Sequence, residues 1–226
     1  VGKVLAGDEV SINTVLDCGF KYYADSRIEN FSIVRNKDIK KVLLRIPSLS
    51  NVNYVIINTH ISLNSELETI IALNKAALSQ NKIHQIILMF DLGDLREGIF
   101  YQDDYLPLIA EILKLSNIKL IGIGTNLTCY GGIIPTYDNL AILLEIKNMI
   151  KQKFDYALDI ISGGNSSSME LMMKGLIPRK INNLRIGEAL VLGRETAYGS
   201  LIKNMYNDIF TVKAEIIEIK VKPSYP

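Results

Sequence analysis

The sequence predicts an α/β fold, a (β/α)8 TIM barrel followed by the start of a C-terminal β domain. Eight short apolar runs, rich in β-branched residues, recur along the chain, and stretches with helical spacing separate most of them. The runs are almost wholly apolar, as expected for parallel strands that are covered on both faces. A doubly wound open sheet is the alternative arrangement for the same pattern.

Strands are expected at the apolar runs, which are residues 1–5, 20–24, 42–46, 54–57, 85–90, 119–123, 156–161 and 183–185. Short apolar runs bounded by polar or turn-forming residues are typical of buried strands. The first run starts at residue 1 itself, so we expect the barrel to begin partway into its first strand, truncated at its N-terminus.

Helices are expected in the gaps between these runs. Ser62 is a candidate N-cap for a helix whose apolar stripe reaches Leu78. The same spacing predicts a helix over residues 106–113, and a Pro-Thr start predicts another over residues 135–153. The gap around residues 48–52 is short and has room for one helical turn.

The pattern changes after about residue 196. From Phe210 to Ile216 every second residue is apolar, and the phase then slips as it does at a β-bulge. We therefore expect two domains. Residues 1–196 form the barrel, and residues 197–226 form a linker with the first strand of an incomplete C-terminal β domain.

Composition excludes several classes of partner. Lys and Arg total 25 against 24 acidic residues, so no electrostatic argument favours a nucleic acid or an anionic membrane. No apolar run approaches the ~18 residues of a membrane-spanning helix. Two cysteines are too few for a disulfide framework, which favours a reducing, cytoplasmic location. The cysteines and the two histidines are isolated and form no transition-metal ligand pattern.

Glycine- and serine-rich loops follow the last two predicted strands of the barrel. Gly163 and Gly164 permit close approach of backbone to a ligand, and three serines come directly after Asn165. Gly187 is expected to open a short helix that ends near Leu192, and free N–H groups at helix starts bind phosphate. These two loops form the usual phosphate site of such barrels, with an ordinary polar turn as the alternative.

Lys3 lies at the end of the first predicted strand, across the barrel mouth from these loops. Lysine is the side chain that forms a Schiff base with an aldehyde cofactor. A lysine, a phosphate loop and an arginine available for a ring nitrogen together match pyridoxal phosphate (PLP). For Lys3 alone, a solvated terminal lysine is the alternative.

Several motifs resemble those of the alanine-racemase-type barrel enzymes, the fold type III PLP proteins, and within them the branch that contains ornithine racemase. They occur in the family's order and cover essentially the whole chain. The motifs are GKVLAGD from residue 2, ADSRIEN from 24, DLGDLREG from 91, GIGTNL from 122, SGGNS from 162 and LRIGE from 184.

The resemblance implies roles for two cationic residues. Lys3 matches the lysine that carries the cofactor and acts as one racemising base, while Arg185 matches the arginine that faces the pyridine nitrogen. Arginine stays protonated and only donates, so the nitrogen opposite it stays unprotonated. The cofactor is then a weaker electron sink, which favours returning a proton to Cα over transamination.

The resemblance also implies how the rest of the cofactor is held. Arg96 matches an arginine near the phenolic oxygen. Asn126 lies where alanine racemases place a histidine against the cofactor ring. Ser166, with the backbone amides of Gly187 and Glu188, matches the phosphate cradle.

Two departures from the family pattern bear on substrate and mechanism. Alanine racemases carry a lysine at the position of Met89, so its absence argues against alanine as the substrate. Their second base is a tyrosine of the C-terminal β domain that acts across a head-to-tail dimer, and the resemblance therefore implies a homodimer. Cys129 is a candidate for the opposing acid, with a small, inert loop or core cysteine as the alternative.

These observations predict a PLP-dependent racemase that interconverts L- and D-amino acids, with ornithine or another basic amino acid as its small-molecule substrate. Candidates to meet a distal ammonium group, or to pair with neighbouring arginines, are Asp25, Asp91, Asp94 and Glu97. A non-catalytic PLP-binding barrel of vitamin homeostasis and a D-amino-acid lyase are the alternatives within the same fold.

Overall fold

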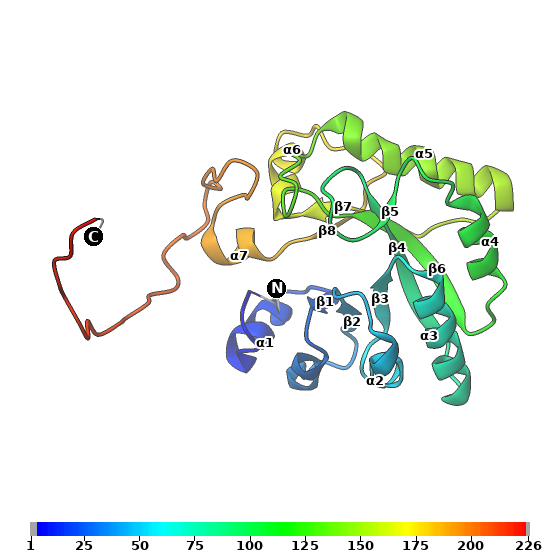
Figure 1. Ribbon diagram of the computed structural model, residues 1–226, viewed down its shortest axis with the longest axis horizontal. Helices are drawn as coiled ribbons and strands as arrows, with labels where there is room; N and C mark the ends of the chain where they lie inside the picture. Colours follow the sequence, from blue (N-terminus) through cyan, green and yellow to red (C-terminus); the bar gives the residue numbers. More distant parts are fainter. Residues whose placement is uncertain (1–3, 225–226) are drawn as a thin grey trace.

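The computed structural model describes residues 4–224, which form a parallel barrel with helices on its outside and an extended C-terminal tail (Figure 1). Neighbouring strands are parallel and follow the order β1-β2-β3-β4-β6-β7-β8. Their bounds are Tyr22–Asp25 (β1), Lys40–Leu43 (β2), Ile61–Asn64 (β3), His84–Asp91 (β4), Ile118–Thr125 (β6), Ile160–Asn165 (β7) and Asn183–Arg185 (β8). The short strand β5, Ile99–Phe100, pairs with the end of β4.

Helices connect most of the strands. Their bounds are Glu9–Asp17 (α1), Val52–Asn58 (α2), Leu67–Ser79 (α3), Leu106–Leu113 (α4), Tyr137–Phe154 (α5), Met169–Met173 (α6) and Glu188–Leu192 (α7). The predicted start of α5 is confirmed, because Thr136 Oγ1 accepts from the Asn139 backbone N–H and Asn139 Oδ1 accepts from that of Thr136. Short 3-10 turns cover Ile28–Ile33, Leu49–Asn51 and Ser166–Ser168.

The strands separate two hydrophobic cores. The barrel interior is filled by the buried side chains of Val42, Ile61, Leu63, Ile87, Met89, Ile121 and Ile160. The alternate residues of β4, such as Ile86 and Leu88, belong to the larger core that also contains the helices' buried residues. Because both faces of the strands are covered, the prediction of a barrel of buried parallel strands is confirmed.

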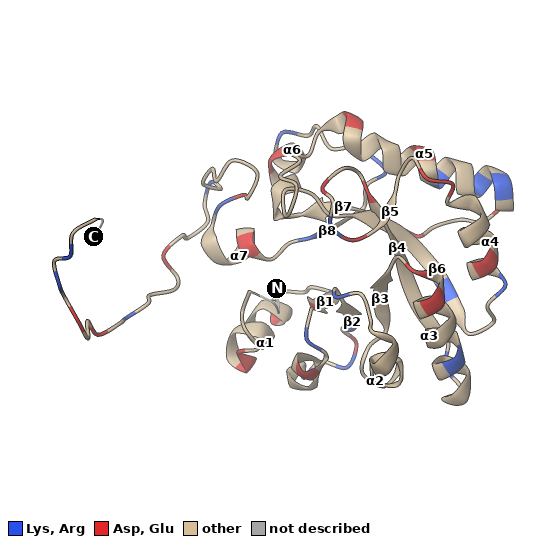
Figure 2. Ribbon diagram, in the orientation of Figure 1, with Lys and Arg blue, Asp and Glu red and all other residues tan. Residues whose placement is uncertain are grey.

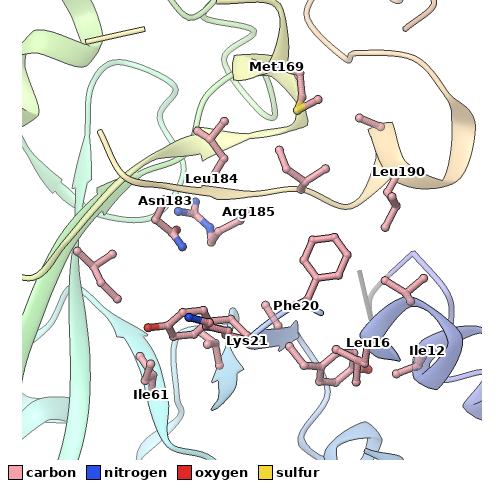
Figure 3. A pocket seen from close by; sticks show the side chains of 18 of the residues that line it. Ile12, Leu16, Phe20, Lys21, Ile61, Met169, Asn183, Leu184, Arg185 and Leu190 are labelled. Carbon is pink, nitrogen blue, oxygen red and sulfur yellow. The ribbon is translucent and has the colours of Figure 1, made fainter. Parts of the chain in front are cut away.

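The barrel is nearly closed. No strand of the described chain lies between β8 and β1, and a groove of about 420 Å³ runs along this gap, which we call the seam. Leu184 and Leu190 line one side of the seam and Leu16 and Phe20 the other (Figure 3). The first strand, predicted over residues 1–5, is not seen, because residues 1–3 lie outside the described residues and residues 4–7 form a turn.

The strand predicted over residues 54–57 is wrong, since these residues belong to helix α2. Val52, Val55 and Ile56 are buried while Tyr54 and Ile57 are exposed, which is the spacing of a helix stripe. An apolar run of this length fits one helical turn as well as a strand, so periodicity alone did not distinguish them.

The true third strand, β3, was missed, and the helix expected to start at Ser62 begins instead at Leu67. In β3, Ser62 and Asn64 alternate with Ile61 and Leu63, and all four are buried. The two polar residues broke the wholly apolar pattern that we used to predict strands.

The remaining six predicted strands overlap observed strands, but two of them only slightly. Residues 156–161 share Ile160 and Ile161 with β7, and residues 42–46 share Val42 and Leu43 with β2.

The tail from residue 203 to residue 224 contains no helix or strand, and nearly all of it is exposed. The strand predicted from Phe210 is therefore not formed in the described chain. A strand requires a hydrogen-bonding neighbour, and residues 4–224 supply none to this segment. The division into a barrel and a C-terminal β domain stays a prediction.

Charged residues of both signs are interspersed over the helices and loops (Figure 2). A search of residues 4–224 for a helix long and apolar enough to cross a bilayer finds none. The same part of the chain has no cluster of three or more His, Cys, Asp or Glu side chains arranged to hold a metal ion.

Candidate functional site

A cavity of about 270 Å³ opens at the carboxyl ends of the strands, and we call it the mouth cavity. Six of the seven predicted site residues line it, and they are Arg96, Asn126, Ser166, Arg185, Gly187 and Glu188. The seventh, Lys3, lies outside the described residues. Its neighbour Val4 lines the same cavity. Reactive groups of such barrels lie at this end, so the predicted residues are brought together where chemistry is expected.

Arg185 at the end of β8 is held by two neighbouring strands. Its Nη1 donates to Ser162 Oγ and its Nη2 to the Thr125 carbonyl oxygen, both at 2.7 Å, and Ser162 Oγ donates onward to Asn183 Oδ1. Burial lowers the pKa of the guanidinium to about 10, and the charge of Glu97 opposes this shift. The group is therefore still protonated at neutral pH and acts only as a donor.

Ser166 connects the loop after β7 to the start of α7. Its Oγ is buried and accepts from the backbone N–H groups of Gly187 and Ala189, at 3.2 and 3.1 Å. Gly164, two residues earlier, has φ +102°, and a Cβ there would lie 2.8 Å from Ser168 Oγ. Glycine is therefore required at this turn, and the predicted short helix after Gly187 is confirmed as α7.

Two asparagines tie the carboxyl ends of β6 and β7 together. Asn165 Nδ2 donates to Asn126 Oδ1 at 2.7 Å and to the Leu127 carbonyl oxygen at 2.8 Å. Asn165 Oδ1 accepts from the Ser167 N–H at 2.8 Å. Asn165 was not among the site residues predicted from the sequence. Its position directly before Ser166 of the predicted phosphate loop was the one local feature that could have indicated it.

Arg96 and Cys129 meet at the rim of the mouth cavity. Arg96 Nε pairs with Glu97 Oε2 at 2.7 Å, and its Nη1 donates to Cys129 Sγ at 2.9 Å. Cys129 is exposed and lines the cavity, so it is not a core residue, and the choice between an opposing acid and an ordinary loop cysteine stays open. Cys129 comes to this position because the wholly buried Asp94 accepts from the backbone N–H groups of Cys129, Tyr130 and Ile133.

Most of the candidate carboxylates are engaged in the structure itself. Asp25 accepts from Tyr23, Arg27 and Asn30, and Asp91 accepts from two backbone N–H groups of its own loop. Glu97 is also engaged, because it pairs with Arg96 as the alternative in the sequence analysis allowed, but it lines both the mouth cavity and an adjoining cavity of about 340 Å³.

The strand ends bring a half-buried arginine, a serine–glycine loop and an exposed thiol to one cavity, and a parallel barrel with such a site has the features of barrels that bind an anionic small molecule. The family follows from the sequence. Residues 7–195 match the family model described as "Alanine racemase, N-terminal domain", and the chain belongs to this family.

Two curated relatives are similar over most of this chain. Ornithine racemase of Acetoanaerobium sticklandii is 53% identical over 205 residues, which are 91% of this chain and 58% of the relative. Lysine racemase of Thermotoga maritima is 35% identical over 228 residues, covering 100% of this chain and 63% of the relative. The chain thus spans about three fifths of the length of these relatives.

Solved structures share the fold. Alanine racemase of Clostridium difficile 630 superposes with a TM-score of 0.66 at 20% identity, covering 82% of this chain and 49% of that one. PipY of Synechococcus elongatus PCC7942, solved with PLP bound, gives 0.65 at 12% identity over 79% and 85%. D-threonine aldolase from Filomicrobium marinum gives 0.66 at 10% identity over 88% and 56%.

Proposed function

We propose that the protein is a PLP-dependent amino-acid racemase that acts on a basic amino acid, ornithine or lysine. The observation that carries the proposal is the mouth cavity, where a half-buried guanidinium and a serine–glycine loop from neighbouring strands line one space. The similarity to an ornithine racemase at 53% identity and a lysine racemase at 35% supports the substrate class.

The donors in the mouth cavity fit PLP. Ser166 and the backbone N–H groups at Gly187 and Glu188 would hold the phosphate, and Arg185 would face the ring nitrogen. Asn126 Nδ2 is buried and has no hydrogen-bond partner among residues 4–224, which suits a site that receives a ligand with acceptor atoms. When bound, PLP supplies an electron sink that stabilises negative charge at Cα.

The chain's own residues would direct the fate of the Cα proton. Arg185 stays protonated at neutral pH, so it would donate to the ring nitrogen of bound PLP and would keep that nitrogen unprotonated. This limits electron withdrawal and favours return of the proton to Cα. Lys3 is the proposed base on one face, and Cys129 Sγ is proposed to hold the proton that is returned from the other.

Glu97 is the proposed determinant for a basic side chain. It lines the mouth cavity and the adjoining cavity, where Arg45 and Arg96 are also present. A carboxylate between these two spaces would attract a distal ammonium group that extends out of the mouth cavity. Glu97→Gln is expected to raise the KM for ornithine about tenfold and leave that for norvaline unchanged. Equal changes for both substrates would contradict the assignment.

We also propose that the protein works as a homodimer in the cytoplasm. Its two cysteines are free thiols, which suits a reducing compartment.

The proposed homodimer is tested by sedimentation at several protein concentrations, which measures the assembly state. A monomer at every concentration would rule out the dimer.

The activity is tested by incubating the protein with L-ornithine and PLP and resolving the enantiomers. D-ornithine is expected in excess over a Lys3→Ala control. Absorbance of bound PLP without racemisation would favour the non-catalytic binding alternative. Cleavage products in place of the other enantiomer would favour a lyase.

A further inference from the structure

Asn126 presents a buried donor that has no partner within residues 4–224. The residue is 6% exposed and lines the mouth cavity, and its Nδ2 makes no hydrogen bond. Leaving a buried donor unpaired destabilises a fold by the cost of its desolvation, so such groups are rare. An unpaired donor beside a cavity points to a ligand acceptor.

The polarity of the Asn126 amide is fixed by its neighbours. The Ser167 backbone N–H can only donate, so the Asn165 oxygen must face it at 2.8 Å. Asn165 Nδ2 therefore faces the Leu127 carbonyl and Asn126, and Asn126 must present its oxygen there. Nδ2 of Asn126 is left for another partner.

This arrangement joins two parts of the proposed site. Asn165 directly precedes Ser166 of the proposed phosphate loop. Asn126 directly follows Thr125, whose carbonyl oxygen holds the Arg185 guanidinium. One hydrogen bond between the asparagines thus connects the loop that would bind phosphate to the strand end that would face the cofactor ring.

We propose that Asn126 Nδ2 donates a hydrogen bond to the ring system of bound PLP, and that Asn165 is the positioning residue that fixes this polarity. The inference rests on the proposed function, because it takes PLP as the ligand. A donor oriented before binding needs no reorganisation when the ligand arrives, so its contribution to affinity is retained.

The test is a PLP titration followed by the visible absorption of the bound cofactor. Asn126→Asp removes the donor at nearly constant shape. Asn165→Asp keeps an acceptor for the Ser167 N–H but stops donating to Asn126, whose amide then turns its NH2 group toward the new carboxylate. Both changes are expected to raise the Kd for PLP roughly tenfold, the size expected for one lost hydrogen bond, and to shift the absorption maximum.

Coupling distinguishes positioning from a general loss of structure. In an Asn126→Ser background, Asn165→Asp should change neither Kd nor absorption maximum further, since it acts through the Asn126 amide. Asn182→Asp is the matched control. Asn182 also bridges two backbone groups, accepting from Ile161 N–H and donating to the Asp159 carbonyl, but it does not line the mouth cavity.

The outcomes separate the inference from the proposed function. Failure of the unaltered protein to bind PLP would overturn both. PLP binding that is unchanged in Asn126→Asp and Asn165→Asp, with thermal melts that show folded protein, would overturn the inference alone. Asn126→Ser provides the same comparison if Asn126→Asp does not fold.

Discussion

The barrel has two openings, and they are built differently. Around the mouth cavity, side-chain hydrogen bonds cross between strand ends, from Asn165 to Asn126 and from Arg185 to Thr125. Along the seam, no strand pairing joins β8 to β1 in the described chain, and the groove is lined mainly by apolar side chains. The comparison indicates that the paired strands β6, β7 and β8 position the proposed cofactor contacts, whereas the described part of the seam has few hydrogen bonds that could position a side chain.

Arg185 lines both openings, as do Ala24 and Ile186. Arg185→Leu removes the donor for the ring nitrogen and leaves the Thr125 carbonyl without that partner. Racemase activity is expected to fall about 100-fold or more, the size seen when a donor facing a reacting centre is removed. Steady-state kinetics and PLP absorbance measure the loss. The exposed Arg179→Leu is the control, and equal losses in both variants would contradict the role given to Arg185.

The contrast between the paired strands and the seam predicts that truncating a side chain in β6 destabilises the fold more than truncating one in the seam. Ile123 of β6 is wholly buried, whereas Phe20 in the seam is 49% exposed. Ile123→Ala should lower the free energy of unfolding by about 3 kcal/mol, since it leaves a cavity, and Phe20→Ala by less than about 1 kcal/mol. Urea unfolding measures both. A loss at Phe20 as large as at Ile123 would show that the seam is packed as well as the paired strands.

A buried histidine on the paired side makes stability depend on pH. His84 Nε2 bonds Ser62 Oγ at 2.9 Å, and burial, with the nearby charges of His60 and Lys82, lowers the His84 pKa from 6.5 to about 4. The unfolded chain therefore binds a proton in this window that the folded one does not. Stability should fall by about 2–3 kcal/mol as pH drops from 6.5 toward 4. Unfolding at pH 7 and 4.5 measures this fall, and an equal fall in His84→Gln would contradict the assignment.

Substituting a glycine in the turn beside the mouth cavity should lower stability by less than Ile123→Ala does. Gly164→Ala places a methyl group 2.8 Å from Ser168 Oγ at a positive φ and should destabilise by about 2 kcal/mol. Gly175 also has a positive φ, but a Cβ there meets nothing within 4 Å, so Gly175→Ala should cost about 1 kcal/mol. Thermal melts compare the two. Equal losses of stability would mean that the cost comes from backbone strain alone and that the contact with Ser168 adds nothing to it.

Much of the site was predictable because its signals are local in sequence. Gly164, Ser166 and Gly187 lie in loops directly after strands, and parallel strands bring those loops to one end of a barrel. The Asn165–Asn126 bond joins residues 39 apart, so no local pattern could reveal it. The exposure of Cys129 likewise depends on the distant Asp94.

The fold was harder to predict where buried residues are polar. β3 was missed because Ser62 and Asn64 are buried through a hydrogen-bond network with His84 rather than by apolarity. The strand predicted over residues 54–57 was a helix because one face of that short run packs inward. Whether such a run becomes a strand or a helix depends on which segments lie beside it in the folded protein, and these segments are distant in sequence.

The exposed tail contains protease sites that need no unfolding to be cleaved. Lys203, Lys213 and Lys220 lie exposed in a segment without helix or strand. Trypsin therefore meets cleavable bonds there without any unfolding, whereas lysines inside helices such as α5 become cleavable only after local opening.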